Sequence, residues 1–398
     1  MATNNNNKAL NVPHLRFPEF NGEWETKLIN DLAVVIGGGT PDTTIKSYWD
    51  GEIQWFTPSE IGKNKYVDSS LRTITEEGLN NSSAKLLPPN TILLSSRATI
   101  GECSLSLREC ATNQGFQSLV SKKCYVDFLY YLIQTKKRDL IRKSCGSTFL
   151  EISANEVRKI QVSVPTDVEQ QKIAGLLSLI DERIATQNKI IEKLQSLIKG
   201  LSQQLLSSEN DWILYRLDDL AQIKSGYSGT QVSYQTPYKV SRIETISKHC
   251  IDIQRIGYVE CIPESYRLNV GNILFSNINS IQYIGNTAYL DKDYGLYHGM
   301  NLLRIIPNTT IVRPRFLHLL LCTDWAINHF QTICNKAVSQ ASINQTALGK
   351  SRFPIPPMSV QQQICSMFEL TERKLDNEQE YISCLQQQKR YLLQKMFI

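Results

Sequence analysis

The sequence predicts an α+β protein in which two repeated, strand-rich globular domains are separated by two long helices that pair antiparallel as a coiled coil. Two observations carry this prediction. Short motifs recur in the same order in both halves of the 398-residue chain. Each half also ends in a segment whose apolar residues follow alternating steps of four and three. A duplicated unit of one domain and one helix accounts for both.

The repeat is clearest at two tryptophan motifs. Residues 24–33 are WETKLINDLA and residues 212–221 are WILYRLDDLA, the same W-x4-[IL]-x-D-L-A pattern at an offset of 188 residues. Further matches follow in the same order: Gly38 with Gly226, the apolar runs 91–95 (TILLS) with 272–276 (NILFS), Gly101 with Gly285, Pro165 with Pro356, and Gln170 with Gln361. Ordered matches at nearly constant spacing indicate diverged copies of one unit.

These matches divide the chain into five segments. We expect an N-terminal arm (1–23), a first globular domain (24–165), a first helix (166–207), a second globular domain (208–356) and a second helix (357–398). Both globular segments contain short apolar runs bounded by Gly, Pro, Asn and Ser, which is typical of strands and turns.

The first helical segment has the heptad spacing of a coiled coil, with polar Gln187 in the one gap. Its predicted pairing residues are Ile173, Leu177, Ile180, Ile184, Ile191, Leu194, Ile198 and Leu201. Pro165 blocks extension of the helix towards the N-terminus, and Asp167 can cap it.

The second helical segment repeats this spacing with more polar interruptions, and Glu378 stands where the first has Gln187. Its predicted pairing residues are Ile364, Phe368, Leu375, Ile382, Leu385 and Leu392. A simpler alternative is that each helix packs its apolar stripe on its own globular domain. However, such a helix is roughly 60 Å long at 1.5 Å per residue, longer than one compact domain needs. Antiparallel pairing would relate the two halves by a pseudo-twofold axis and make the helices a rigid spacer.

Composition places the chain among soluble proteins. Charged residues make up 20% and the net charge is +5, which permits binding to a polyanion without requiring it. No stretch has the run of about 18 apolar residues that a membrane span needs, and we expect a cytoplasmic protein with no membrane partner. The ten cysteines include no C-x-x-C pair, so we expect free thiols.

Motifs for catalysis or metal binding are missing from the sequence. It has no G-x4-G-K-[ST] phosphate loop and no G-x-S-x-G, and residues 37–40 (GGGT) are typical of a turn. The five histidines show no metal-ligand spacing, and His318 fits an apolar helix face better than a metal site. We therefore expect no catalytic residues, no metal and no cofactor on this chain.

A duplicated domain-helix unit without catalytic motifs resembles the DNA-specificity subunits of Type I restriction-modification systems. Residues 12–20 (VPHLRFPEF) resemble that family's N-terminal arm, and 38–41 (GGTP) resemble the start of its recognition domains. Residues 164–165 (VP) with 169–174 (EQQKIA) resemble the entry into its first helix. The second copy departs from this pattern because no glutamate precedes Gln361.

The resemblance implies a function and partners. Each globular domain would be a target recognition domain that reads one half of a split double-stranded DNA site, while the helices fix the gap and dock two methyltransferase subunits. Those partners would use S-adenosylmethionine to methylate an adenine flipped out of the duplex. Restriction subunits, which translocate and cleave DNA, would bind ATP and Mg.

Residues for DNA contact are hypotheses based on charge and position. Exposed cations contact phosphates, and an arginine at a strand end can read a base or form a structural ion pair. The candidates are Lys63, Lys65, Arg97, Lys136, Lys137, Arg138, Arg142 and Lys143, followed by a small turn at 145–148 (CGST), with Lys336 and Gln340 in the second copy. A solvated helix face is the alternative for the basic run 136–143.

Other functions remain open at this point. A specificity polypeptide served by one fused methyltransferase-nuclease would have the same sequence features. A coiled-coil adaptor with two protein-binding heads would also be duplicated, but would have little affinity for duplex DNA. An enzyme would need a pocket of perturbed ionisable groups.

Overall fold

The computed structural model describes residues 10–146, 150–207, 212–247, 249–336 and 340–398. The chain forms two compact units, each built from one globular domain and parts of both long helices. The first unit is Met1–Ile190 with Glu378–Ile398, and the second is Ile191–Asn377. Within the described residues, no helix is long and apolar enough to cross a membrane.

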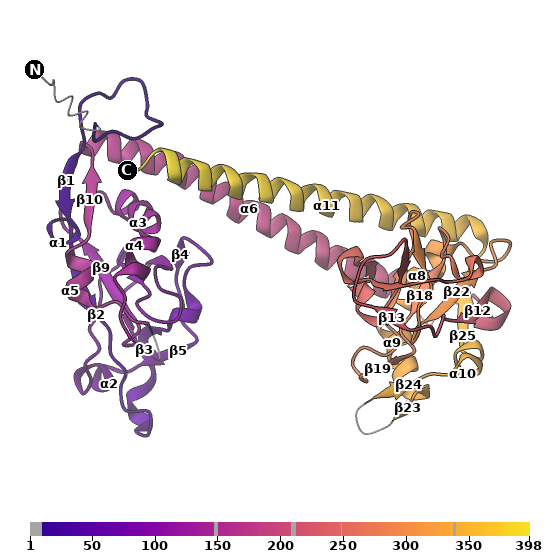
Figure 1. Ribbon diagram of the computed structural model, residues 1–398. Helices are drawn as coiled ribbons and strands as arrows, with labels where there is room; N and C mark the ends of the chain where they lie inside the picture. Colours follow the sequence, from indigo (N-terminus) through magenta and orange to yellow (C-terminus); the bar gives the residue numbers. More distant parts are fainter. Residues whose placement is uncertain (1–9, 147–149, 208–211, 248, 337–339) are drawn as a thin grey trace, which may run out of the picture. The chain divides into compact units, whose positions relative to one another are not determined.

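The globular domain of the first unit is built from small sheets with short helices around them (Figure 1). Its sheets have the strand orders β2-β9-β6-β7-β4, β5-β3-β8 and β1-β10. The strands are β1 (Glu25–Leu28), β2 (Ala33–Gly37), β3 (Trp49–Phe56), β4 (Tyr66–Val67), β5 (Arg72–Ile74), β6 (Ile92–Leu94), β7 (Cys103–Ser106), β8 (Cys110–Thr112), β9 (Gln117–Ser121) and β10 (Gln161–Val164). The helices are α1 (Ile29–Leu32), α2 (Glu76–Asn80), α3 (Val126–Thr135), α4 (Lys137–Arg142) and α5 (Ala154–Arg158).

The globular domain of the second unit repeats this plan. Its sheets include β12-β22-β18-β20, β13-β17-β14-β21, β19-β24-β23 and β11-β25. The strands are β11 (Ile213–Arg216), β12 (Ala221–Ser225), β13 (Gln231–Val232), β14 (Tyr238–Val240), β15 (Ile246–Ser247), β16 (Cys250–Ile251), β17 (Gly257–Val259), β18 (Ile273–Phe275), β19 (Ile278–Asn279), β20 (Thr287–Tyr289), β21 (Leu296–Tyr297), β22 (Leu303–Pro307), β23 (Asn335–Lys336), β24 (Ala341–Ser342) and β25 (Arg352–Ile355). The helices are α7 (Leu217–Leu220), α8 (Pro314–Leu321), α9 (Asp324–Ile333) and α10 (Gln345–Gly349).

Close backbone packing explains one pair of repeated glycines. A Cβ on Gly38 would lie 1.9 Å from the carbonyl oxygen of Asn113, and a Cβ on Gly226 would lie 1.8 Å from that of Gly299. No side chain fits at either place. The predicted repeat is therefore a repeat of backbone geometry as well as of sequence.

The apolar runs of the sequence form the buried strands β6 and β18, as predicted. After each strand the chain turns through a left-handed glycine, Gly101 (φ 85°) or Gly285 (φ 82°). The amide of Gly101 donates to Ser95 and the amide of Gly285 donates to Ser276, so the two turns close in the same way. The loop after the strand thus has the same position in both domains.

Each long helix is anchored at its start by a buried glutamine. In α6 (Asp167–Leu205), the Gln170 amide donates to the Pro165 carbonyl over 3.0 Å and accepts from the Tyr125 amide over 2.9 Å. In α11 (Met358–Lys395), Gln361 donates to Pro356 over 2.9 Å and accepts from the Arg313 amide over 2.8 Å. The repeated glutamine therefore has the same structural role in both copies.

The start of each helix packs on its own globular domain, as the simpler alternative held. Ile173, Leu177 and Ile180 belong to the core of the first domain, and Ile364 and Phe368 belong to that of the second. The other predicted pairing residues are buried or half-buried. Domain packing and helix pairing therefore occupy successive parts of the same apolar stripe.

The helices run antiparallel where both belong to the first unit. Gln187 bonds to Glu378, the Arg183 guanidinium lies 3.4 Å from the Tyr381 hydroxyl, and Lys389 forms a 2.7 Å ion pair with Asp181. Residue numbers rise along one helix as they fall along the other. The polar pair that interrupts both predicted apolar seams is thus a direct contact, and the predicted α+β fold with an antiparallel helix pair is confirmed.

The N-terminal arm is fixed to the first unit by a buried ion pair. Arg16 donates two 2.7 Å hydrogen bonds to Glu169, whose side chain is 1% exposed and also accepts from Trp24 over 3.3 Å. This interaction raises the pKa of Arg16. In the second copy Val360 takes the place of Glu169 and packs against the core. At this position the second copy therefore has an apolar contact in place of the ion pair.

Candidate nucleic-acid interface

Three predicted segments of the first domain come together on its surface. The loop after β6 bonds to the segment beyond α4, because the Ile152 amide donates to Ser96 over 3.1 Å and Arg97 forms a β-bridge with Glu151. Helix α4 lies against the same loop, since a Cβ on Gly101 would meet Lys137. The candidate interface of this domain is therefore the group formed by residues 95–102, α4 and the described residues 145–146 and 150–151.

Most cations of this group form surface ion pairs. Arg97 pairs with Glu151 over 2.8 Å, Lys137 with Glu102, and Arg142 with Asp139 over 2.8 Å. Lys143 lies 3.7 Å from Glu156. Exposed ion pairs contribute only about 0–1 kcal/mol, so a phosphate can replace the carboxylate at little cost.

Two of the predicted cations of the first domain have side chains with no partner within the described part of the chain. Lys63, in the loop before β4, and Arg138, on α4, are exposed and form no hydrogen bond or ion pair there. Their charges are available to a polyanion without breaking any contact. A phosphate can therefore bind either of them without displacing a carboxylate.

Two other predicted cations have structural contacts. Lys65 is 9% exposed, pairs with Asp127 over 2.5 Å, donates to Ser178 over 2.7 Å and lies over the Tyr131 ring. Lys136 donates to the main-chain oxygen of Ile398 over 2.7 Å, and burial lowers its pKa. We therefore correct the expectation for Lys65, whose charge is enclosed by the fold, and rank Lys136 below the free cations.

Three of the buried polar atoms that lack a partner lie at the same loop of the two domains, while others, on Gln117, Ser118, Gln134 and Arg313, lie elsewhere. Among the described residues, Ser96 Oγ and Arg97 Nε lack a hydrogen-bond partner in the first domain, and Asn277 Oδ1 lacks one in the second. Ser96 and Asn277 are equivalent, because the main-chain carbonyl of each accepts a hydrogen bond from the amide of an isoleucine, Ile152 or Ile343. Buried polar groups are normally paired, so this loop holds unused hydrogen-bonding capacity.

The second domain builds its counterpart from three short strands. Strand β24 pairs with β19 on one side and β23 on the other. The predicted residues Lys336, at the end of β23, and Gln340, before β24, are both exposed. Ser147 and Thr148 of the predicted turn 145–148 lie outside the described residues. The two candidate interfaces therefore share a backbone plan and differ in side chains.

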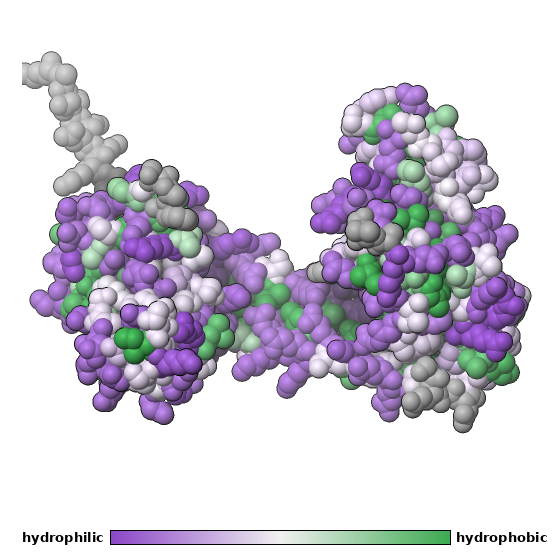
Figure 2. Space-filling view, turned by 90° about the horizontal axis from the view of Figure 1, so that it is seen from below, coloured by the Kyte–Doolittle hydropathy of each residue, from purple (hydrophilic) through white to green (hydrophobic). Residues whose placement is uncertain are grey.

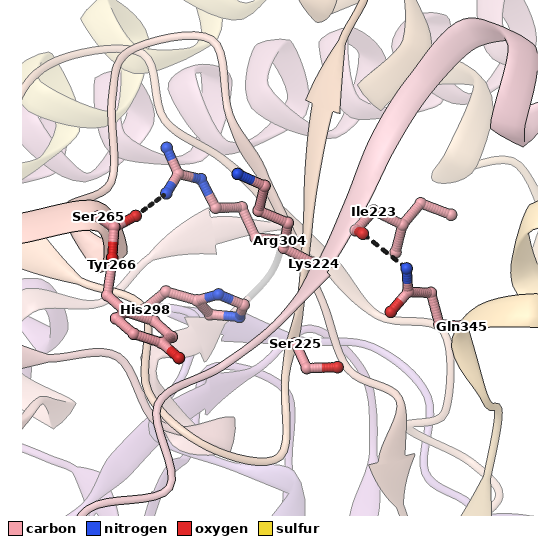
Figure 3. Close-up of a pocket in the computed structure, with 8 residues that line it drawn as sticks. All are labelled: Ile223, Lys224, Ser225, Ser265, Tyr266, His298, Arg304 and Gln345. Carbon is pink, nitrogen blue, oxygen red and sulfur yellow. Dashed lines mark hydrogen bonds between the residues drawn. The ribbon is translucent and has the colours of Figure 1, made fainter. Parts of the chain in front are cut away.

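Sequence reasoning missed a polar pocket in the second domain. A cavity of about 460 Å³ is lined by Ile223, Lys224, Ser225, Ser265, Tyr266, His298, Arg304 and Gln345 (Figure 3). Burial, with a smaller contribution from the charge of Arg304, lowers the pKa of His298 to about 4. The signal was an arginine inside the apolar strand sequence LLRII, where a charge needs an explanation.

Over the described ranges, no group of three or more His, Cys, Asp or Glu side chains is placed to hold a metal ion. His318 is buried on α8 with its ring stacked on Tyr289, as expected for a residue on an apolar helix face. On the face shown in Figure 2 the surface of both globular domains is mainly hydrophilic, with small apolar patches.

Comparison with known proteins gives consistent matches over most of the chain. Residues 21–196 and 209–387 each match the model of the Type I restriction modification DNA specificity domain. The Type I restriction enzyme MjaIX specificity subunit of Methanocaldococcus jannaschii is 30% identical over 327 residues, which cover 69% of this chain and 75% of that protein.

Solved structures share the fold. The Type-I restriction-modification system S subunit from M. genitalium matches with a TM-score of 0.61 at 17% identity, covering 97% of this chain and 99% of that one. A structure concerned with complex assembly and conformational transition of the type I R-M system matches with a TM-score of 0.61 at 15% identity, covering 94% and 97%.

Proposed function

The chain belongs to the Type I restriction-modification DNA specificity family, and from this premise we propose that each of its globular domains reads one half of a split double-stranded DNA site. As a specificity subunit it is the non-catalytic member of its enzyme. Base contacts in the grooves supply sequence preference, while phosphate contacts fix the register.

One observation most directly supports the proposal that the two globular domains recognise different DNA sequences. The loop after the buried strand is held by the same bond in both domains, from Ile152 to Ser96 over 3.1 Å and from Ile343 to Asn277 over 2.9 Å. Next to this shared bond stand Arg97 in one domain and Ile278 in the other. A common scaffold that presents different side chains would recognise two half-sites of different sequence.

The cations of the first domain supply the sequence-independent part of binding. Arg138 and Lys63 are free for phosphates, and Arg97, Lys137, Arg142 and Lys143 can exchange weak surface ion pairs for phosphate contacts. Lys336 has the same role in the second domain, where the exposed amide of Gln340 can reach a base edge.

The long helices provide the surface for protein partners. Several large apolar side chains on α6 and α11 are exposed, among them Val168, Leu179, Leu197, Met367 and Leu370. Exposed apolar groups of this kind are typical of protein interfaces. We assign them to two methyltransferase subunits, with restriction subunits joining the assembly in the cytoplasm. S-adenosylmethionine, ATP and Mg would be bound by those partners.

Genome-wide mapping of methylated adenine tests this proposal. The full chain is co-expressed with its cognate methyltransferase subunit in a host without adenine methylation, and the DNA is read by single-molecule sequencing. We expect one motif with two defined halves and a constant gap. A stable complex that produces no new methylation would instead favour an adaptor with protein-binding heads.

A substitution shows whether the proposed readers carry the specificity. Arg97→Ala should relax the motif in one half only, because that side chain belongs to the first domain. Arg108→Ala is a matched control, since Arg108 also forms an exposed ion pair, with Asp68, in the same domain, but follows β7 at the end opposite to residues 95–102. Equal relaxation of both halves by Arg97→Ala would contradict the assignment.

A further inference from the structure

The pocket of the second domain contains two cations on neighbouring strands. Strand β12 pairs with β22 so that Lys224 lies directly opposite Arg304. Directly opposed residues of an antiparallel pair share a face of the sheet, and like charges in this position destabilise it. Figure 3 shows both side chains in the cavity, with their charged ends on the same side of the strands.

The charges of this pair are not neutralised within the described residues. Arg304 is 5% exposed and donates only to uncharged oxygens, to Asn272 Oδ1 over 2.8 Å and to the Ser265 carbonyl over 3.4 Å. Lys224 is exposed and forms no ion pair there. A buried arginine normally has a carboxylate or another anion beside it. Within the described part of the chain, no such anion lies beside Arg304.

The duplication provides an internal comparison. The same register in the first domain, between β2 and β9, places Ile36 opposite Ser118. The fold therefore does not require cations at this position. Since the first copy forms the same strand pair with an apolar and a hydroxyl side chain, the doubly cationic pair is a property of the second domain alone.

We propose that Lys224 and Arg304 form a phosphate-binding pocket in the second domain, and that it receives a phosphodiester of the DNA bound there. The source of the phosphate rests on the proposed function, whereas the pocket itself does not. Guanidinium and ammonium groups together bind a phosphate group through charge-assisted hydrogen bonds. A cavity of about 460 Å³ also has room for the sugar next to that phosphate.

The test compares full-length wild-type protein with Lys224→Met, using Lys350→Met as the matched control. Lys350 is another exposed lysine of this domain without an ion pair among the described residues. In the first arm, inorganic phosphate is added and the Tm is followed. We expect phosphate to raise the Tm of wild type and Lys350→Met by more than that of Lys224→Met, because only the last has lost a ligand of the pocket.

In the second arm, binding to a labelled random-sequence duplex is measured over a range of KCl concentrations. Each phosphate contact contributes about 0.9 to the slope of log K against log salt, so Lys224→Met should lose about that much. Arg304→Met should have the same effect on the slope if this variant folds. If it does not fold, Lys224→Met alone tests the proposal.

The two arms separate the outcomes. Loss of the phosphate effect together with the reduced slope supports a DNA phosphodiester. Loss of the phosphate effect with an unchanged slope supports a pocket for free phosphate. Equal behaviour of Lys224→Met and Lys350→Met in both arms overturns the proposal. If wild type fails to bind duplex DNA at low salt, the proposed function fails, and the phosphate arm still decides on the pocket.

Discussion

The buried ion pair between Arg16 and Glu169 gives a stability prediction that can be worked out from the structure. The two side chains are 15% and 1% exposed, and two 2.7 Å hydrogen bonds join them. Glu169→Gln removes the negative charge and leaves the largely buried guanidinium without a counter-charge, although it still donates to the carbonyls of Gly22 and Asn21. Breaking a buried pair on one side costs about 3–5 kcal/mol, and we expect about 3 kcal/mol because the amide oxygen can still accept one hydrogen bond.

Urea unfolding followed by tryptophan fluorescence measures this loss, since Trp24 also contacts Glu169 over 3.3 Å. Hydrogen exchange should place the change in the N-terminal arm and at the start of α6. Glu182→Gln is the control, because Glu182 is an exposed glutamate on the same helix, and it should change stability by less than about 0.5 kcal/mol.

A double-mutant cycle with Arg16→Met isolates the pair. Once the arginine is gone, Glu169→Gln no longer leaves a buried cation without a counter-charge, so the coupling energy should exceed about 2 kcal/mol. A cost of about 1 kcal/mol or less for Glu169→Gln, as for an exposed pair, would refute this account of how the arm is held.

Three other predictions follow from named contacts. Gly226→Ala should destabilise the second domain by about 1–3 kcal/mol or more in urea unfolding, because its Cβ would lie 1.8 Å from the Gly299 oxygen; unchanged stability would mean that the backbones can separate. Between pH 6.5 and about pH 4 the second domain should lose stability as the pH falls. In this range His298 binds a proton in the unfolded chain but not in the folded one, where its pKa is lowered to about 4. The loss is about 3 kcal/mol, and a His298→Gln protein with the same acid profile would disprove the prediction. Arg138→Met should lower the slope of log K against log salt for DNA binding by about 0.9. Lys65→Met should instead lower the stability of the protein and leave this slope unchanged. The opposite result for the two variants would show that Lys65, and not Arg138, is the free cation.

The overall fold was predictable because the duplication and the heptads are patterns of many residues. Misassigning a single residue therefore leaves both patterns recognisable. The equivalence of Gln170 and Gln361 was visible as a sequence match, but its cause was not. That cause is a bond to the carbonyl of Pro165 or Pro356, and hydrogen-bond partners depend on tertiary structure.

Single cations were less predictable for a physical reason. Lys63 and Lys65 are neighbours in the sequence, yet one is free and the other is enclosed by Asp127, Ser178 and aromatic rings. Only the direction in which each side chain points in the folded protein decides whether its charge is free or enclosed. The opposition of Lys224 and Arg304 likewise needs the strand register, which joins residues far apart in the chain.

The central claim is that each globular domain reads its own half of the DNA site. Replacement of residues 208–356 by the second globular domain of another specificity subunit tests it most directly, with the methylated adenine motif read from the host genome. The account predicts that one half of the motif changes while the other half and the gap length remain. A motif that changes in both halves, or in neither, would contradict it.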